Sequence, residues 1–512
     1  MSMVVQHNMQ AANANRMLGI TSGAQAKSTE KLSSGYKINR AADDAAGLTI
    51  SEKMRKQIRG LDKASSNAQD GVSSVQTAEG ALTEVHSMLQ RMNELAVQAA
   101  NGTNSKDTDR KAIQDEIDQL NTEIGRVAET TKFNEIYLLK GDDGEKTVNM
   151  NAHDAGLKGT LTDNGDGTAT FTMKELNDGD TVSIGGKNYT IGSKEADAKA
   201  LIEAPANGDP DKTFTIGDKT FKVKANGDVC DKDGNKLYVK TAGGATAAEA
   251  FDTSKELTTD STFKNNANTD TANKAVTVAN LKDYVKGGVK VSDGTTTMTV
   301  LTDAKDAAGA DGVDDNDTSV ITKQKAYELA GKELLAANQI GDTEGHASVT
   351  NGDGTGLAFN AGNGTFKINV GQAKVANTLS FSLHVGADAD MTNKITVDID
   401  TMNSANLGIK GLNVTDKNGS AATYAIDAIS DAISKVSSQR SALGAVQNRL
   451  EHTIDNLDNI SENTSSAESR IRDTDMAKEM VNYSKNNILA QAGQSMLAQA
   501  NQSNQGVLSL LQ

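Results

Sequence analysis

Apolar residues near both ends of the chain recur at alternating spacings of three and four. The clearest series comprises Val75, Ala78, Leu82, Val85, Leu89, Met92, Ala96 and Ala99. Such spacing puts a narrow apolar stripe on one side of a helix, which is typical of helices that pack along one another. We therefore predict a long helix through this region.

Two further series have the same period. The first follows Asn101-Gly102 and comprises Ile113, Ile117, Leu120, Ile124 and Val127. The second comprises Ile426, Ile429, Ile433, Val436, Leu443, Leu450, Ile454 and Leu457, with Arg440 and Gln447 interrupting its register. A single stripe of this kind indicates only a bundle core. Matching stripes at opposite ends of the chain predict that both termini contribute to one long helical coiled-coil rod.

The middle of the chain, residues 142–379, has a different pattern, in which turn signals separate short alternating segments. Examples are 182–184 and 189–191 around Gly185-Gly186, and 214–216 and 221–223 around Gly217-Asp218. These patterns predict β-hairpins, with short helices at 245–257 and 319–338. The predicted fold class is α+β, with a β-rich insert of one or two domains that divides near 205–210.

The outermost segments, 4–35 and 473–512, have helical patterns but few charges, and none follows Lys485. A helix of small apolar groups and amides buries too little to be stable alone. We expect both segments to become ordered by packing against copies of the same chain. Frayed ends without a function are the alternative. The residues expected to drive association are Val4, Val5, Met9, Met476, Met480, Ile488, Leu497, Val507, Leu508, Leu510 and Leu511.

Composition narrows the function further. The net charge of −16 disfavours a nucleic-acid or anionic membrane partner, and 9 Phe, 8 Tyr and no Trp leave few aromatic residues for a core. Cys230 is the single cysteine, so no intramolecular disulfide can form. The first residues lack the features of a secretory signal, and no 18 apolar residues run together. Taken alone, these features indicate a cytosolic protein.

The sequence contains none of the common catalytic or metal-binding motifs. Its histidines, at positions 7, 86, 153, 346, 384 and 452, form no HExxH pattern, and neither G-x-S-x-G nor a P-loop occurs. The run Asp163-Asn164-Gly165-Asp166-Gly167 lacks the ligand spacing of a calcium loop and fits a hairpin turn better. We therefore expect no catalytic residues, no cofactor and no metal.

The terminal blocks resemble bacterial flagellin. Residues 31–48 read KLSSGYKINRAADDAAGL, residues 89–101 read LQRMNELAVQAAN, and residues 465–477 read SSAESRIRDTDMA. The runs QANQ at 499–502, VLSLL at 507–511 and LHVGA at 383–387 add to the match. Two positions depart from the family pattern. Glu135 follows Phe133-Asn134 where the family usually has Gly, and 503–506 lack a common proline.

The resemblance implies a structural subunit of the flagellar filament, which serves motility and is not an enzyme. It also implies an extracellular protein, exported unfolded by the flagellar apparatus without a cleaved signal, which overrides the cytosolic interpretation. The expected domains are 1–45 and 473–512 (inner core), 46–141 and 380–472 (rod), and 142–379 (outer insert). The implied partners are further copies of the chain, an export chaperone, the filament cap and hook-associated junction proteins.

The resemblance further implies recognition by the host Toll-like receptor 5 through Gln90, Arg91, Leu95 and Glu116. The same residues are also expected to pack between subunits. We predict that Arg91 and Leu95 lie on one helical face, with Leu95 exposed and Glu116 joining them from the next helix. Two alternatives remain. One is a hook–filament junction protein with the same terminal helices, and the other is a flagellin with a metalloprotease insert, which the missing HExxH disfavours.

Overall fold

The computed structural model describes residues 8–105, 108–302, 311–357, 364–416 and 418–510, with side chains up to 503. The chain divides into two compact units. Unit 1 comprises Met1–Glu79, Ser380–Asp398 and Ser441–Gln512, and unit 2 comprises Gly80–Leu379 and Ile399–Arg440. The long helices α2 (Ala45–Ala100) and α7 (Ser420–Arg472) each contribute to both units.

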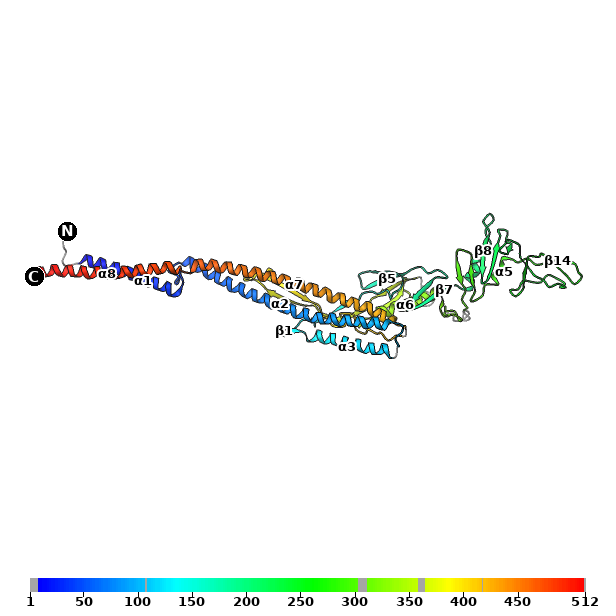
Figure 1. The fold of residues 1–512 in the computed structure, drawn as a ribbon, viewed down its shortest axis with the longest axis horizontal. Helices are drawn as coiled ribbons and strands as arrows, with labels where there is room; N and C mark the ends of the chain where they lie inside the picture. Colours follow the sequence, from blue (N-terminus) through cyan, green and yellow to red (C-terminus); the bar gives the residue numbers. More distant parts are fainter. Residues whose placement is uncertain (1–7, 106–107, 303–310, 358–363, 417, 511–512) are drawn as a thin grey trace. The chain divides into compact units, whose positions relative to one another are not determined.

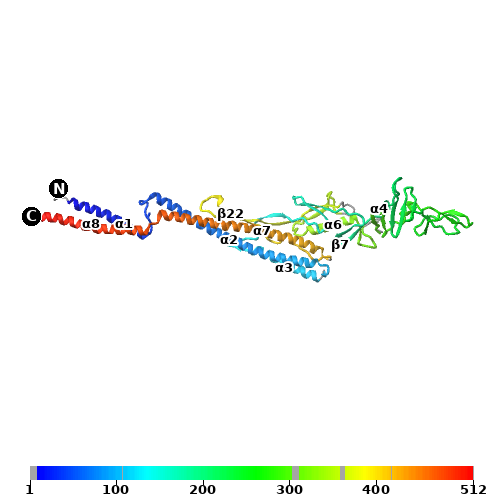
Figure 2. The same ribbon diagram turned by 45° about the horizontal axis from the view of Figure 1, so that its top comes forward.

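Unit 1 contains two pairs of helical segments. Helices α1 (Met9–Ser34) and α8 (Met476–Leu510) lie side by side, as do the first part of α2 and the last part of α7 (Figures 1 and 2). Strands β21 (Leu379–His384) and β22 (Lys394–Ile399) form a two-stranded sheet, and the 3-10 helix η1 (Met391–Asn393) lies in the loop between them. The core of this unit combines residues of α2, α7 and the β21–β22 segment, and none of α1 or α8: Leu61, Ala64, Ala68, Val385, Ile395, Leu450 and Leu457.

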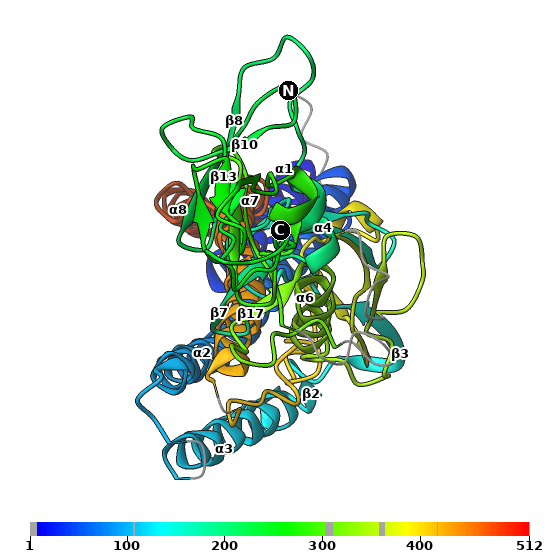
Figure 3. The same ribbon diagram turned by 90° about the vertical axis from the view of Figure 1, so that its right-hand side faces the viewer.

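In unit 2, helix α3 (Asp109–Thr130) lies alongside the end of α2 (Figure 3). The predicted seam is confirmed where α2 crosses from unit 1 into unit 2, because every residue of the series from Val75 to Ala99 is at most 1% exposed. In the second series Ile113, Ile117 and Ile124 are buried, and in the third Ile429, Val436, Leu443, Leu450 and Leu457 are buried. Leu120, Val127, Ile426, Ile433 and Ile454 are only half-buried.

The β-structure of unit 2 consists of several small sheets. The two-stranded ones pair β1 (Lys132–Phe133) with β2 (Ile136–Tyr137), β3 (Asp142–Asn149) with β20 (Gln372–Asn377), β11 (Tyr238–Val239) with β12 (Leu257–Thr258), and β13 (Thr262–Lys264) with β14 (Asp270–Ala272). One antiparallel sheet has the order β18-β19-β5-β4, with bounds Ser348–Asn351, Thr365–Asn369, Thr168–Met173 and Gly159–Asp163.

Two further sheets contain the predicted hairpins. In the first, β6 (Thr181–Ile184) pairs antiparallel with β7 (Lys187–Gly192), and β17 (Val320–Thr322) joins β7 in parallel. In the second, of order β10-β9-β8-β15-β16, β8 (Lys212–Ile216) pairs with β9 (Lys219–Val223). Its other strands are β10 (Val229–Cys230), β15 (Lys290–Ser292) and β16 (Thr297–Thr299). Both predicted hairpins are therefore confirmed.

The insert has two separate hydrophobic clusters. One contains residues from 155–191 and 321–368 together with Tyr424 of α7, and the other contains residues from 198–300. Short helices pack into them: α6 (Lys323–Asn338) into the first, and α4 (Glu195–Leu201) and α5 (Val278–Lys282) into the second. The predicted α+β class is confirmed, because long helices come from both ends of the chain and the middle is β-rich.

The predicted helix at 245–257 is wrong, because this segment contains no helix and ends in β12. Side chains compete there for the backbone groups that a helix would use. Thr241 Oγ1 accepts from the Glu249 amide at 3.1 Å, and Asp252 Oδ1 accepts from the Ser254 amide at 2.8 Å. The prediction for 319–338 is confirmed only from Lys323 onward, because residues 320–322 form β17.

Candidate functional site

Helices α1 and α8 have well-defined boundaries. Asn8 caps the start of α1, its side chain accepting from the Ala11 amide at 2.9 Å, and Gly35 ends the helix with a φ of 75°. At the start of α8, Asp475 Oδ1 accepts from the Lys478 amide at 3.0 Å. Both helices therefore begin where a local side chain accepts from a backbone amide of the first turn, and α1 ends at a left-handed glycine.

The two helices run antiparallel, and a side-chain hydrogen bond joins them near each end. Asn8 Nδ2 donates to the Ala500 carbonyl at 3.1 Å, and Ser28 Oγ donates to Glu479 Oε1 at 2.6 Å near the other end. The Ser28 hydroxyl is the main reason why the pKa of Glu479 lies below its ordinary value. Ser28 is also the only buried residue of α1, and no described side chain of α8 is buried.

Large apolar side chains on this helix pair face water. Exposed fractions range from 47% for Leu489 to 73% for Met9, and the set is Met9, Met17, Ile20, Met476, Met480, Val481, Ile488, Leu489 and Met496. Soluble proteins seldom leave so many large apolar side chains exposed on one small element without a partner surface. The pair is therefore a candidate site for association with another protein surface.

Most of the residues expected to drive association belong to this pair. Met9, Met476, Met480 and Ile488 are exposed, and Leu497 is half-buried. Val4, Val5 and Leu511 lie outside the described residues. Val507, Leu508 and Leu510 belong to α8, but their side chains are not among those described.

The segments that connect these helices to α2 and α7 are joined to each other. Tyr36 and Asp473 form an antiparallel bridge, and the Lys37 amide donates to the Arg472 carbonyl at 2.7 Å. The Arg472 guanidinium lies 4.9 Å from the centre of the Tyr36 ring and donates a hydrogen bond to Glu52. That bond is the main reason why the pKa of Glu52 is lowered.

A second candidate surface lies on α2 and α3 in unit 2. Arg91 Nε donates to Glu116 Oε1 at 2.9 Å, and Arg91 Nη1 donates to Glu94 Oε2 at 3.1 Å. The Arg91 and Glu116 side chains are about half exposed, and the hydrogen bond with Glu116 is the first cause that raises the pKa of Arg91. Gln90 shares a hydrogen bond with His86 at 3.1 Å. The predicted meeting of Arg91 and Glu116 is confirmed.

The prediction that Leu95 is exposed is wrong, because its side chain is only 2% exposed. Leu95 immediately precedes the seam residue Ala96. A single helix packed along the seam would leave the Leu95 side chain at the edge of the contact. However, α3 covers this flank of α2, as the Arg91–Glu116 ion pair shows. Packing against α3 therefore buries residues of α2 that lie beside the heptad seam, in addition to the seam itself.

Arg110 is a structural residue that the sequence patterns did not reveal. It is 1% exposed and donates three hydrogen bonds to backbone carbonyls: to Ala99 and Asp416 at 2.8 Å and to Asn101 at 3.2 Å. Cations are favourable at a helix C-terminus, where carbonyls lack partners. Arg110 therefore fastens the end of α2 to the start of α3 and to the segment before α7.

Metal-binding geometry is not found in the part of the chain that the structure describes. No group of three or more His, Cys, Asp or Glu side chains there is arranged to hold a metal. Cys230 is a free, buried thiol. Among the described helices, none has the length and apolar character needed to cross a bilayer.

Two family models match the ends of the chain. The model for the bacterial flagellin N-terminal helical region matches residues 5–143, and that for the C-terminal helical region matches residues 426–511. A flagellin of Clostridium tyrobutyricum is 36% identical over 506 residues, covering 98% of this chain and 100% of the relative. Polar flagellin A of Vibrio parahaemolyticus is 33% identical over 511 residues, covering 100% of both chains.

Solved structures are similar only at a low level. FliC from Burkholderia pseudomallei aligns with 74% of this chain and 99% of its own, at 16% identity and a TM-score of 0.25. A TM-score this low does not indicate a shared fold. The sequence matches are decisive, because they extend from end to end. The chain belongs to the bacterial flagellin family, and it is a structural subunit of the extracellular flagellar filament and not an enzyme.

Proposed function

We propose that the paired helices α1 and α8 are the polymerisation element of this flagellin. Terminal helices of neighbouring copies pack together in the filament core and cover the apolar side chains that the single chain exposes. The observation that carries the proposal is the row of side chains that are 47% to 73% exposed on helices with no buried apolar residue among those described.

The energetics favour assembly over a stable single chain. Fully burying one Leu, Ile or Met side chain contributes roughly 1.5–3 kcal/mol. The exposed set on α1 and α8 forgoes much of this contribution until another surface covers it. A neighbouring copy that binds the folded helices, and not the unfolded ones, stabilises the folded helices by mass action. Copies of the chain thus provide one another with the apolar burial that a single copy lacks.

The test is a double substitution on the exposed face of α8. Met480→Asp with Ile488→Asp should raise the critical concentration for filament formation at least tenfold, because two charges would be buried between subunits. Thr295→Asp, at an exposed turn of the insert, adds the same type of charge as a control. Normal assembly of the folded double variant would contradict the proposal.

The finer features of the family are proposals for this chain. Export unfolded through the flagellar apparatus fits termini that bury little before assembly, and an export chaperone and a filament cap would act before and during polymerisation. We assign 1–45 and 473–512 to the inner core, 46–141 and 380–472 to the rod, and 142–379 to the outer insert. A hook–filament junction protein is the alternative, and the abundance of the chain in isolated filaments discriminates between them.

Recognition by Toll-like receptor 5 is a second proposed function. It is supported by the exposed ion-pair network of Arg91 with Glu94 and Glu116, beside Gln90. Leu95, being buried, would support the surface from below instead of contacting the receptor directly. Arg91→Ala should weaken receptor binding by the monomer, whereas Arg126→Ala, which removes the exposed Glu123 pair, should not. Equal receptor affinities of the two variants would exclude this site.

A further inference from the structure

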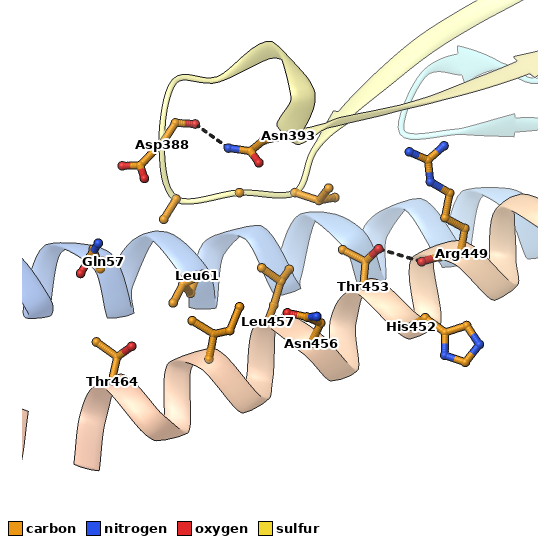
Figure 4. Close-up of a pocket in the computed structure, with 14 residues that line it drawn as sticks. Gln57, Leu61, Asp388, Asn393, Arg449, His452, Thr453, Asn456, Leu457 and Thr464 are labelled. Atoms are coloured by element: carbon orange, nitrogen blue, oxygen red, sulfur yellow. Dashed lines mark hydrogen bonds between the residues drawn. The ribbon is translucent and has the colours of Figure 1, made fainter. Parts of the chain in front are cut away.

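An open groove of about 800 Å³ lies in unit 1, outside the terminal helices (Figure 4). Its walls are α2, α7 and the loop between β21 and β22. Leu61, Val385 and Leu457 are buried along its floor, and Ile460, which also lines it, is 45% exposed. The loop approaches α2 closely, because a Cβ added at Gly60 would lie 2.9 Å from Ala387 Cβ.

Three polar side chains of α7 at the groove have no partner among the described residues. Arg449 and His452 of α7 are exposed, and neither they nor Asn456 form a hydrogen bond or ion pair there. The polar contacts that do exist within the lining are local, such as Thr453 to the Arg449 carbonyl at 2.7 Å (Figure 4). An apolar floor with a polar rim and a free arginine is the usual anatomy of a protein interface.

The hairpin of β1 and β2 in unit 2 has complementary features. Ile136 and Tyr137 are 44% and 42% exposed, and the exposed Glu135 precedes them. Asn134 and Glu135 both have positive φ, 44° and 68°, in a two-residue turn where glycine would be less strained. Glu135 forms no hydrogen bond or ion pair with the described residues. Strain retained at an exposed charged tip is typical of a functional position.

We propose that the groove of one copy receives the β1–β2 hairpin of a second copy. Ile136 and Tyr137 pack on the floor formed by Leu61, Val385 and Leu457, and the Glu135 carboxylate pairs with the Arg449 guanidinium at the rim. The contact is heterologous, joining different surfaces of the two copies, so it can repeat from copy to copy without closing on itself. The inference rests on the proposed assembly and adds a specific contact to it.

Reciprocal charge reversal tests this contact with the full-length chain. Arg449→Glu alone and Glu135→Arg alone should each raise the critical concentration roughly tenfold, because like charges then face each other. A chain with both substitutions should recover most of the loss, and so should a one-to-one mixture of the two single variants. Arg59→Glu is the matched control, because Arg59 lies two residues from both Gln57 and Leu61 and so on another face of α2.

A cross-link provides a second readout. Arg449→Lys preserves the charge, and a carbodiimide should then join residues 449 and 135 of different copies in filaments but not in monomers. The inference is overturned if both single variants assemble like the wild type, if the reciprocal pair gives no rescue, or if no such cross-link forms. Binding of a small molecule in the groove with assembly unaffected would likewise overturn it. Failure of the wild type to assemble would instead refute the proposed function.

Discussion

Replacing Arg110 by methionine should open the end of the three-helix region of unit 2. Methionine keeps an unbranched apolar stem but removes the guanidinium that holds the carbonyls of Ala99, Asn101 and Asp416. These acceptors belong to two segments, the end of α2 with the residue after it and the segment before α7. The substitution therefore acts on the junction and leaves the seam residues of α2 in place.

The expected magnitude follows from the burial of the group. Hydrogen bonds from a charged donor are worth roughly 1.5–3 kcal/mol each, and Arg110 makes three. Removing the guanidinium also relieves several kcal/mol of desolvation, because the residue is only 1% exposed. We expect a net loss of about 3 kcal/mol in local stability, which is roughly a 100-fold faster local opening.

Amide hydrogen exchange of the monomer measures this opening directly. The amides of 110–117 should exchange roughly 100-fold faster in Arg110→Met than in the wild type. The control is Arg126→Met on the same helix, whose guanidinium pairs with Glu123 and is 60% exposed. Exposed pairs contribute about 0–1 kcal/mol, so its exchange should change little. Equal exchange in the two variants would refute the assigned role of Arg110.

The other predictions concern the turn, the termini and the insert. Glu135→Gly should stabilise the monomer by about 0.5 kcal/mol, measured by urea unfolding, because the relief of left-handed strain exceeds the extra entropy of glycine when unfolded. Ser28→Ala should raise the pKa of Glu479, measured by NMR titration, toward its ordinary 4.5. In the wild type a depressed carboxyl pKa stabilises the native state above about pH 4.5, and this stabilisation is lost as the pH falls through the folded pKa, so acid should loosen the α1–α8 pair. Replacing 142–379 by a Gly/Ser linker should leave a chain that still forms filaments, as seen by electron microscopy. The replacement should lower the thermal stability of the start of α7, because Tyr424 is 5% exposed within the cluster of the insert. A folded chain that never assembles would show that the insert is part of the subunit contact.

Periodicity predicted the helices well, because the spacing of the apolar residues along the chain also decides which side of the helix is buried. Residues such as Leu82, Leu89 and Met92 are buried because they repeat on one side of α2, and that repeat is visible in the sequence. The hairpins around Gly185-Gly186 and Gly217-Asp218 were predictable for a similar reason, since a two-residue turn requires a particular local chemistry.

The errors concern features decided by distant partners. Leu95 is buried because α3 covers the flank of α2, and no local pattern states which helix packs where. The segment 245–257 is helical by composition, but Phe251 packs with its ring centre 5.6 Å from that of Tyr284, and side chains occupy its backbone groups. Arg110 resembles any charged residue at a helix start until its three carbonyl acceptors are known.

The exposed apolar side chains of α1 and α8 also bear on the kinetics of filament growth. In the proposed assembly, two copies that meet in solution would cover only part of each other's exposed face, so a dimer would gain little against the entropy of ordering both ends. A copy that arrives at an existing filament end would meet several neighbours at once and cover much more. New filaments should therefore start slowly and grow readily, with a lag phase that short filament seeds abolish.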